Sequence, residues 1–322
     1  HYDSKNFQKL IKELADDLNG HAPDVVAHRF VHGGDISDSA RVVDDVERKR
    51  LNSIIHLAPL HLPSNLLALD LCSAYFNVPQ IACFDTSFHH TMHALSKRLP
   101  IPKSLAIHRF GFHGLNYSHI ARTLPSVIGD IAYKKVVVAH LGSGASLCLM
   151  ENLMSVDTTM GYTPAGGIPM GTRSGDLDPG IMLELAEHND TKQLRDLVFH
   201  KMGLLALSNG ESADMKDLLS SNSDNAKFAV EYFCRQVRGA IGALAGKAGG
   251  IDALVFSAGI GENSSIVRDK ICAPLSFLGI VLAVNANETS ASRIEKQGYK
   301  PIVIIPADEE AVIRDLSVSL RA

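Results

Sequence analysis

Tryptophan is absent from this sequence of 322 residues, and aromatic residues make up only 6% of it. Long apolar runs are absent too, because no stretch approaches the roughly 18 to 20 residues that a membrane-spanning helix needs. The N-terminal segment has neither the apolar core of a signal peptide nor an Arg- and Ser-rich transit pattern. The sequence therefore predicts a cytoplasmic protein that has no contact with a membrane.

Cysteine and excess positive charge are also scarce. The five cysteines (Cys72, Cys83, Cys148, Cys234 and Cys272) lie far apart without a C-x-x-C pair, which excludes a disulfide framework and fits a reducing compartment. Lysine and arginine number 31 against 35 acidic residues, so the formal net charge is −4. No broad basic surface is expected to bind a nucleic acid, and any phosphate group must be held by local groups.

The residues that are present form an ordinary globular composition, 46% hydrophobic and 20% charged. The length suits about two domains, each with its own core. In its first part the hydrophobic pattern predicts, in chain order, a helix over residues 7–18, a strand from residue 24, a helix over 39–55, a helix ending near 76 and a strand over 78–87. Helices and strands that alternate in this way indicate an α/β fold.

The pattern changes from Lys134 onward. Residues 134–157 predict three short strands joined by tight turns, which is an antiparallel unit inside an α/β chain. Farther on we expect helices from about residue 180 and over 225–249, a strand with a glycine turn and a helix start in 252–265, and a strand from 301 before a final helix. No low-complexity linker or short repeat interrupts the order.

Glycine-rich turns recur as HLGSGAS at 140–146, MGTRSGD at 170–176 and SAGIGEN at 257–263. Glycine lets backbone N–H groups approach a phosphate, and a following helix N-terminus favours the negative charge. No G-x-x-x-x-G-K-[ST] motif is present, and GSGASL lacks the third glycine of a dinucleotide fingerprint. The sequence thus predicts phosphate binding outside the ordinary P-loop and Rossmann classes.

Charged side chains accompany these turns and the strand ends. Arg29 and Arg173 stand in glycine-rich surroundings, where a guanidinium can clamp a carboxylate or a phosphoryl group, or form a structural ion pair. Asp85 and Glu309 follow expected strands, where carboxylates can help to bind Mg²⁺ or can serve as helix caps. Both readings remain open for each residue.

The chain has fifteen histidines, two of which lie beside glycine turns. His113 and His140 could each donate a hydrogen bond to a transferring group. His89 and His93 have the i, i+4 spacing of metal ligands on a helix, but no H-E-x-x-H pattern and no third ligand accompany them. A zinc hydrolase is therefore a distant alternative.

Nine motifs in this order resemble the acetate kinase family: HRFVHGG, APLH, FDTSFHHTM, RFGFHG, HLGSGAS, VDTTMGYTP, MGTRSGD, FSAGIGEN and IPADEE. The resemblance covers essentially the whole chain. It implies the fold of the superfamily of acetate and sugar kinases, heat-shock chaperones and actin, with two duplicated α/β ATPase lobes around a cleft that closes on a nucleotide. The first lobe, on the acyl side, is expected at residues 1–86 plus 310–322. The nucleotide-binding and dimerisation lobe is expected at 87–309.

The resemblance implies an enzyme that reversibly transfers the γ-phosphoryl group of ATP to acetate, giving acetyl phosphate and ADP, with Mg²⁺ as cofactor. Arg29 and Arg173 are expected to hold the carboxylate and the phosphoryl group. Asp85 positions Mg²⁺ and the reacting groups, and Glu309 coordinates the metal. His113 donates a hydrogen bond to the phosphoryl group in flight. A homodimer is expected by the same resemblance.

The resemblance also assigns two sets of binding residues. The expected nucleotide-binding residues are His140, Gly142, Ser143, Gly144, Asp214, Lys216, Gly259, Ile260, Gly261, Glu262 and Asn263. The expected apolar pocket for the acyl methyl group is formed by Val31, Leu60, Phe112 and Pro164. With in-line phosphoryl transfer, positioning and charge neutralisation are enough, so no covalent nucleophile is required.

The sequence departs from the family pattern at several points. It starts on a helix, whereas family members begin with a strand and a phosphate loop, so we expect a first lobe without its leading hairpin. Ser143 stands where the family usually has Asn, and Lys216 where an Arg usually contacts the base. We therefore expect either a portion of a longer chain or a truncated, catalytically silent homologue that binds nucleotide. A kinase of propionate or another short-chain carboxylate is a separate alternative, because acyl specificity depends on the volume of the pocket.

Overall fold

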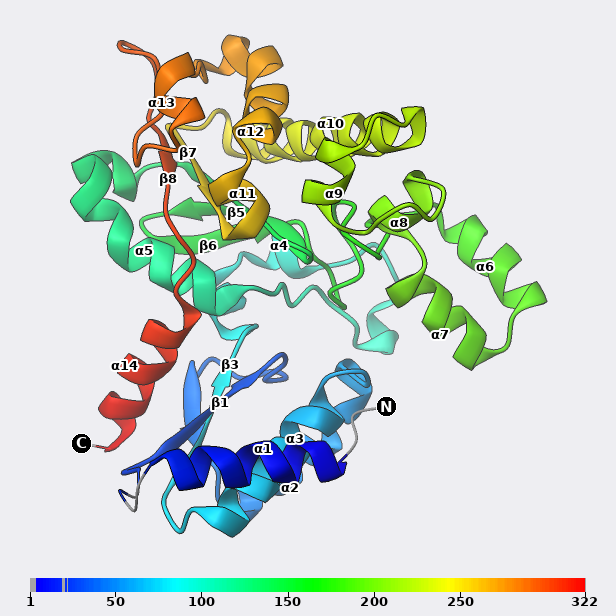
Figure 1. Cartoon of the computed structure of the whole chain (residues 1–322), viewed down its shortest axis with the longest axis vertical. Coiled ribbons are helices and arrows are strands. Elements are labelled where there is room, and N and C mark those ends of the chain that lie inside the picture. Colours follow the sequence, from blue (N-terminus) through cyan, green and yellow to red (C-terminus); the bar gives the residue numbers. More distant parts are fainter. Residues whose placement is uncertain (1–3, 19–20, 22, 322) are drawn as a thin grey trace. The chain divides into compact units, whose positions relative to one another are not determined.

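The computed structural model describes residues 4–18, 21 and 23–321. The chain forms two compact units (Figure 1). Unit 1 comprises His1–His90, Phe112–His119 and Asp308–Ala322, and unit 2 comprises Thr91–Gly111 and Ile120–Ala307. The lobe boundaries expected from the family resemblance stay a prediction.

Unit 1 contains, within its described residues, a sheet of three strands in the order β1-β3-β2. β1 (Val26–Phe30) pairs in parallel with β3 (Gln80–Phe84), and Phe30 lies opposite Phe84. The two strands therefore end side by side, and the residues that follow them emerge at the same edge. This edge of unit 1 is where Arg29 and Asp85 meet.

The third strand corrects one expectation. A helix predicted over residues 39–55 is wrong at its start, because Ala40–Val42 forms β2, antiparallel to β3. The helix α2 begins only at Asp45 and runs to Ser53, with the Asp44 side chain accepting a hydrogen bond from the Glu47 N–H at its N-terminus. Pairing with a neighbouring strand decides the structure of this three-residue segment, and a local pattern does not report that pairing.

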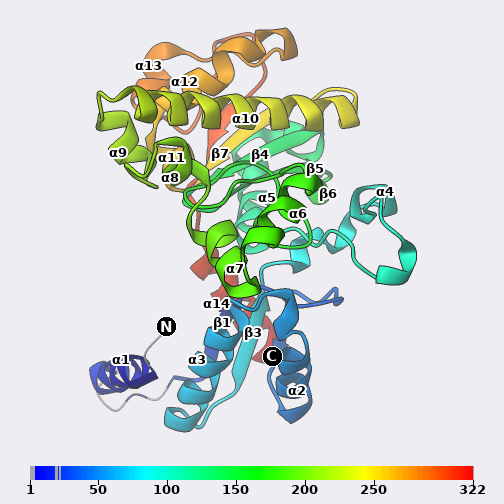
Figure 2. The ribbon, with the colours of Figure 1, turned by 90° about the vertical axis from the view of Figure 1, so that its right-hand side faces the viewer.

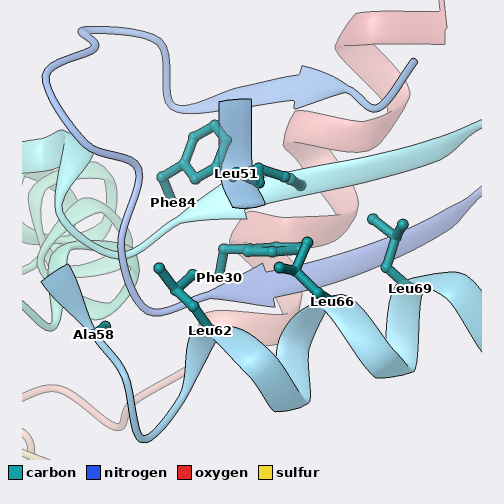
Figure 3. Packing of buried hydrophobic residues seen from close by; sticks show 8 residues of the cluster. Phe30, Leu51, Ala58, Leu62, Leu66, Leu69 and Phe84 are labelled. Atoms are coloured by element: carbon teal, nitrogen blue, oxygen red, sulfur yellow. The ribbon is translucent and has the colours of Figure 1, made fainter. Parts of the chain in front are cut away.

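The core of unit 1 lies between its sheet and the helix α3 (Leu62–Tyr75). Leu62, Leu66 and Leu69 project from α3 toward Phe30 and Phe84 of the two parallel strands (Figure 3). α14 (Glu309–Arg321) packs on the sheet through Val312, which is 2% exposed. The first helix, α1 (Ser4–Asp17), also confirms its prediction.

Unit 2 contains a second sheet, with the order β6-β5-β4-β7-β8 in the described part of the chain. β4, β5 and β6 are antiparallel neighbours, as predicted for residues 134–157, whereas β4, β7 and β8 run parallel. The strands are β4 (Val136–Leu141), β5 (Ala145–Glu151), β6 (Met154–Thr158), β7 (Ala253–Ser257) and β8 (Ile302–Ile304). His140 lies opposite Ser257, so β4 and β7 end together.

Helices surround this sheet. The longest is α10 (Asp224–Ala248), which confirms the helix predicted over 225–249 and ends at Gly249 with φ +68°. It lies along the sheet in Figure 2 and buries Phe233, Val237 and Ile241. α5 (Gly114–Ile128) has residues in both units. The remaining helices are α4 (Ala94–Lys97), α6 (Pro179–His188), α7 (Thr191–His200), α8 (Gly203–Leu207), α9 (Met215–Ser220), α11 (Ala258–Asn263), α12 (Ser265–Cys272) and α13 (Val284–Glu288).

Short 3-10 segments occur at Ile55–Leu57, Ser87–Thr91, Lys103–Leu105, Gly129–Tyr133 and Ala273–Leu278. One of them corrects the histidine pattern. His89 lies in the 3-10 segment and His93 precedes α4, so the two do not share one α-helix. The glycine turn predicted in 252–265 is also wrong in form, because α11 starts directly after β7. None of the described helices is long and apolar enough to cross a membrane.

Candidate active site

An arginine and two carboxylates form a cluster at the strand-end edge of unit 1. The Arg29 Nη2 lies 2.7 Å from Asp85 Oδ2, and its Nε lies 2.9 Å from Glu309 Oε2. Arg29 belongs to β1, Asp85 directly follows β3 and Glu309 is the first residue of α14. Parallel pairing of β1 with β3 and the packing of α14 on the sheet thus bring together three residues that are far apart in sequence.

This cluster, called the Arg29 cluster below, holds one positive and two negative charges. The charge of Asp85 is the main cause that raises the pKa of Arg29 above its ordinary value. Burial first, and the negative charge of Asp85 second, raise the pKa of Glu309. Because the second carboxylate is not fully neutralised by one guanidinium, the Arg29 cluster favours a cation.

The backbone around His113 completes the surroundings of Asp85, which is only 1% exposed. The His113 N–H donates to Asp85 Oδ2 at 3.1 Å, and the Leu115 N–H donates to Oδ1 at 3.3 Å. Gly114 packs so closely that an added Cβ would lie 2.4 Å from the Asp85 carbonyl oxygen. His113 itself has φ +60°, in the left-handed region. The GFHG segment thereby positions His113 next to Asp85, as a catalytic role for both residues requires.

Three of the four predicted acyl-pocket residues lie in unit 1. Phe112 is 1% exposed, and its ring meets that of His32 at 5.6 Å between centroids. The Val31 N–H donates to Asn65 Oδ1 at 3.4 Å, and Leu60 lies in the turn before α3. Pro164, the fourth, belongs to unit 2. Their grouping into one apolar pocket stays a prediction.

Arg173 belongs to unit 2 and has different partners from Arg29. Its Nη1 donates to the Pro164 carbonyl oxygen at 2.6 Å, and burial lowers its pKa. Among the described residues it forms no ion pair. The loop is fixed by its backbone: the Met170 N–H donates to the Arg173 carbonyl at 2.9 Å, and Gly203, with φ +66°, leaves no room for a Cβ beside the Met170 carbonyl. A hydrogen bond thus fixes the Arg173 side chain, but no carboxylate among the described residues balances its positive charge.

A cavity of about 780 Å³ lies in unit 2. Seven of the predicted nucleotide-binding residues line it: Gly142, Ser143, Asp214, Lys216, Gly259, Ile260 and Asn263. It is called the nucleotide cavity below. Its volume falls within the roughly 300 to 1,000 Å³ of small-molecule sites. The lining comes from the β4–β5 turn, from α9 with its N-cap, from α11 and from the start of α12.

Four predicted residues do not line the nucleotide cavity: His140, Gly144, Gly261 and Glu262. His140 is 8% exposed at the end of β4. The Glu262 carboxylate instead accepts a hydrogen bond from the Ala307 N–H at 2.9 Å. Gly261 lies within α11 and is buried, and an added Cβ there would be 3.6 Å from Phe256 of β7. The part of these four residues in nucleotide binding stays a prediction.

Other lining residues were missed by sequence reasoning: Met215, Leu219, Ser220, Ser264, Ser265 and Ile266. Met215 and Leu219 have an i, i+4 spacing that indicates one face of a helix, a signal that is equally typical of a core. The residue before them, Asp214, is the N-cap of α9 and accepts from the Lys216 N–H at 2.7 Å. An N-cap followed by an apolar pair beside a glycine turn is the local pattern that could have suggested them.

The carboxylates of the Arg29 cluster are the candidate ligands for a metal ion. No group of three or more His, Cys, Asp or Glu side chains that could hold a metal ion occurs among the residues placed by the structure. Mg²⁺ needs fewer protein ligands, because one or two carboxylates together with waters and phosphate oxygens suffice. Asp85 and Glu309 are such a pair. Burial first and the charge of Asp85 second raise the pKa of Glu309, and a bound cation would oppose both effects. The residues present therefore fit Mg²⁺.

Comparison with known proteins identifies the family. The sequence profile of the Acetokinase family matches residues 4–315. The chain belongs to the acetokinase family. The acetate kinase of Nitrobacter hamburgensis is 42% identical over 306 residues, which is 93% of this chain and 76% of that protein.

Solved structures agree with this assignment. A propionate kinase from Francisella tularensis superposes with a TM-score of 0.90 at 31% identity, covering 96% of this chain and 83% of that one. The Porphyromonas gingivalis acetate kinase superposes with a TM-score of 0.89 at 29% identity, covering 99% of this chain and 85% of that one. The chain is thus an acetokinase-family phosphotransferase with the actin-like ATPase fold.

Proposed function

We propose that this chain reversibly transfers the γ-phosphoryl group of ATP to acetate, giving acetyl phosphate and ADP. The observation that carries the proposal is the nucleotide cavity, because residues from three segments predicted to bind ATP line one space in unit 2. Family membership supports the same activity. The glycine turn at Gly142 offers backbone donors for phosphate oxygens, and the apolar residues Ile260 and Met215 suit a nucleoside.

The reacting groups are assigned on charge. Arg173, which pairs with no carboxylate in the described part of the chain, is the group we assign to the transferring phosphoryl, whose negative charge it stabilises. His113 donates to the same group. Arg29 orients the acyl carboxylate, and the Arg29 cluster keeps the guanidinium in one place for that task. No protein nucleophile is needed, because the acetate oxygen itself attacks phosphorus and the ADP oxygen leaves.

Mg²⁺ is the proposed cofactor, held by Asp85 and Glu309. It supplies charge neutralisation for the phosphate oxygens when it is bound. The protein contributes two carboxylates whose orientation is fixed, Asp85 by the N–H groups of residues 113 and 115 and Glu309 by Arg29. A homodimer in the cytoplasm, without nucleic-acid or membrane partners, belongs to the same proposal, and the five free, buried cysteines support a reducing compartment.

A propionate or other short-chain carboxylate kinase is the second candidate. The solved structure from Francisella tularensis, named a propionate kinase, favours it. One methylene group changes binding in an apolar pocket by only about 1 to 3 kcal/mol, so the two substrates compete closely. Phe112 and Val31 are the unit 1 residues whose volume decides between them.

The experiment that tests the proposal is hydroxylamine trapping of the acyl phosphate. The 322-residue chain is incubated with ATP, Mg²⁺ and either acetate or propionate, and the hydroxamate is measured. We expect product with acetate, and the ratio of kcat/KM values assigns the acyl preference. ATP binding by calorimetry without any hydroxamate would instead identify a catalytically silent nucleotide-binding homologue.

A further inference from the structure

Arg268 is a fully buried arginine in α12, 0% exposed. Its guanidinium donates to five acceptors. The Nε donates to Asn287 Oδ1 at 2.8 Å, and the Nη2 donates to the Asn287 carbonyl at 2.8 Å and to Ser290 Oγ at 2.9 Å. The Nη1 donates to the carbonyl oxygens of Gly261 and Glu262, each at 2.8 Å. Every acceptor is neutral, which distinguishes this site from the Arg29 cluster.

Burying this charge is costly. Among the residues that the structure describes, no carboxylate pairs with Arg268, and burial lowers its pKa. The five hydrogen bonds offset part of this cost, because they satisfy the guanidinium and its buried acceptors together, so stability is one reason to keep an arginine here. The geometry of the hydrogen bonds that Arg268 forms gives a stronger reason to keep an arginine at this position.

The bonds from Arg268 hold the end of α11. The last carbonyl groups of a helix lack partners inside the helix, and Arg268 satisfies those of Gly261 and Glu262. Asn287 extends the same network, because its Nδ2 donates to the Ser265 carbonyl at 3.0 Å, at the start of α12. One buried network thus fixes both sides of the α11–α12 junction.

The junction is also a wall of the nucleotide cavity. Six of its residues line that cavity: Gly259, Ile260, Asn263, Ser264, Ser265 and Ile266. Arg268 does not line it, and its bonds run to the backbone behind the wall. A shift of α11 by a fraction of an ångström would therefore move lining residues from two helices together.

We propose that Arg268 is a positioning residue for nucleotide binding, acting through the carbonyl groups of α11 and through Asn287. The proposal rests on the assignment of the nucleotide cavity in the proposed function. Arg268 preorganises the wall that contacts the nucleotide and has no contact with the acyl substrate. Its removal therefore affects ATP affinity selectively.

The test compares Arg268→Lys, Asn287→Ala and Ser290→Ala with the wild type. Lysine keeps the positive charge but has no planar fork of five donors, so it cannot hold the carbonyls of α11 and Asn287 at once. We expect Arg268→Lys to raise the Kd for ATP, measured by calorimetry, about tenfold or more, and Asn287→Ala to raise it severalfold. The KM for acetate should change by less than about twofold. Lys270→Met is the matched control, because Lys270 lies on the same helix, is 40% exposed and pairs with Glu231.

Several results would overturn the proposal: an unchanged Kd for ATP in folded Arg268→Lys, or equal increases in the KM values for ATP and acetate. If Arg268→Lys does not fold, the milder Asn287→Ala and Ser290→Ala decide by the same criteria. The proposed function fails separately, when the wild type binds ATP but forms no acyl phosphate. The calorimetric comparison of variants still holds in that case.

Discussion

Arg29 in unit 1 and Arg173 in unit 2 are both arginines of a predicted phosphoryl-transfer site, yet their surroundings differ. Arg29 contacts two carboxylates, and its pKa is raised by Asp85. Arg173 donates to the Pro164 carbonyl oxygen and forms no ion pair with any residue that the structure describes, and burial lowers its pKa. The first guanidinium is part of a cluster with an excess of negative charge, and the second carries an uncompensated positive charge.

The two arginine sites therefore suit different ligands, although the sequence motifs suggest one role for both arginines. A cluster with excess negative charge suits a divalent cation, and in the proposed function its arginine both holds the two carboxylates and orients the acyl carboxylate. An uncompensated buried cation suits an anion, because a phosphoryl group repays the cost of desolvating it. Substitution of Arg173 should therefore lower mainly kcat, and substitution of Arg29 should lower mainly the free energy of unfolding.

The largest expected effect belongs to Arg173→Ala. We expect kcat for acyl phosphate formation to fall by about 100- to 1,000-fold, the loss seen when one donor to a developing negative charge is removed. Stability should change little, because the side chain forms one hydrogen bond. Trapping kinetics and urea unfolding measure the two quantities, and Arg195→Ala, on the exposed surface of α7, is the control. A variant that retains most of its turnover would remove Arg173 from the mechanism.

Arg29→Met should instead destabilise the fold. Removing one partner of a buried ion pair costs about 3 to 5 kcal/mol, and since Arg29 is 37% exposed we expect about 2 kcal/mol. The double variant Arg29→Met with Asp85→Asn should recover part of this loss, because it also removes the buried negative charge. Urea unfolding without Mg²⁺ checks both. Equal free energies of unfolding for Arg29→Met and Arg173→Met would contradict the difference between the two sites.

The smallest effect is a pH dependence at Glu309. Its pKa is raised in the folded state, so the folded chain binds its proton more tightly than the unfolded chain does. Stability from this group is complete below the ordinary pKa of 4.5 and is lost as pH rises through the raised value. In metal-free buffer the wild type should lose free energy of unfolding relative to Glu309→Gln over that window. A relative gain with rising pH would show that the pKa is not raised.

Much of this site follows from sequence, for physical reasons. The strands that carry Arg29 and Asp85 are marked by apolar runs, and parallel strands end at one edge, so their meeting could be expected. The family motifs add Glu309, which reaches the same edge only because α14 packs on the sheet. The bond from Arg173 to Pro164 and the neutral partners of Arg268 depend on loop geometry that no local pattern encodes.

The nucleotide cavity shows the same limit. Its glycine turn at Gly142 was predicted, because a backbone that approaches a ligand closely needs glycine, whereas Gly259 and Gly261 lie in the helix α11. Met215, Leu219 and Ile266 were missed, because an apolar residue looks the same in sequence whether it faces a core or a ligand. The helix prediction is wrong at Ala40–Val42 because this strand pairs with β3, and Ala40 lies opposite Cys83, 43 residues later in the sequence. Long-range pairing and packing, and not local preference, account for these differences.

The most direct test of the two arginine environments is Mn²⁺ binding followed by electron paramagnetic resonance, with Mn²⁺ as a stand-in for Mg²⁺. The wild type, Glu309→Gln and Arg173→Ala are titrated under one condition. The account predicts that Glu309→Gln weakens Mn²⁺ binding at least tenfold, whereas Arg173→Ala leaves it within about twofold of the wild type. Unchanged binding in Glu309→Gln, or a loss in Arg173→Ala that matches it, would contradict the assignment of the cation to the Arg29 cluster.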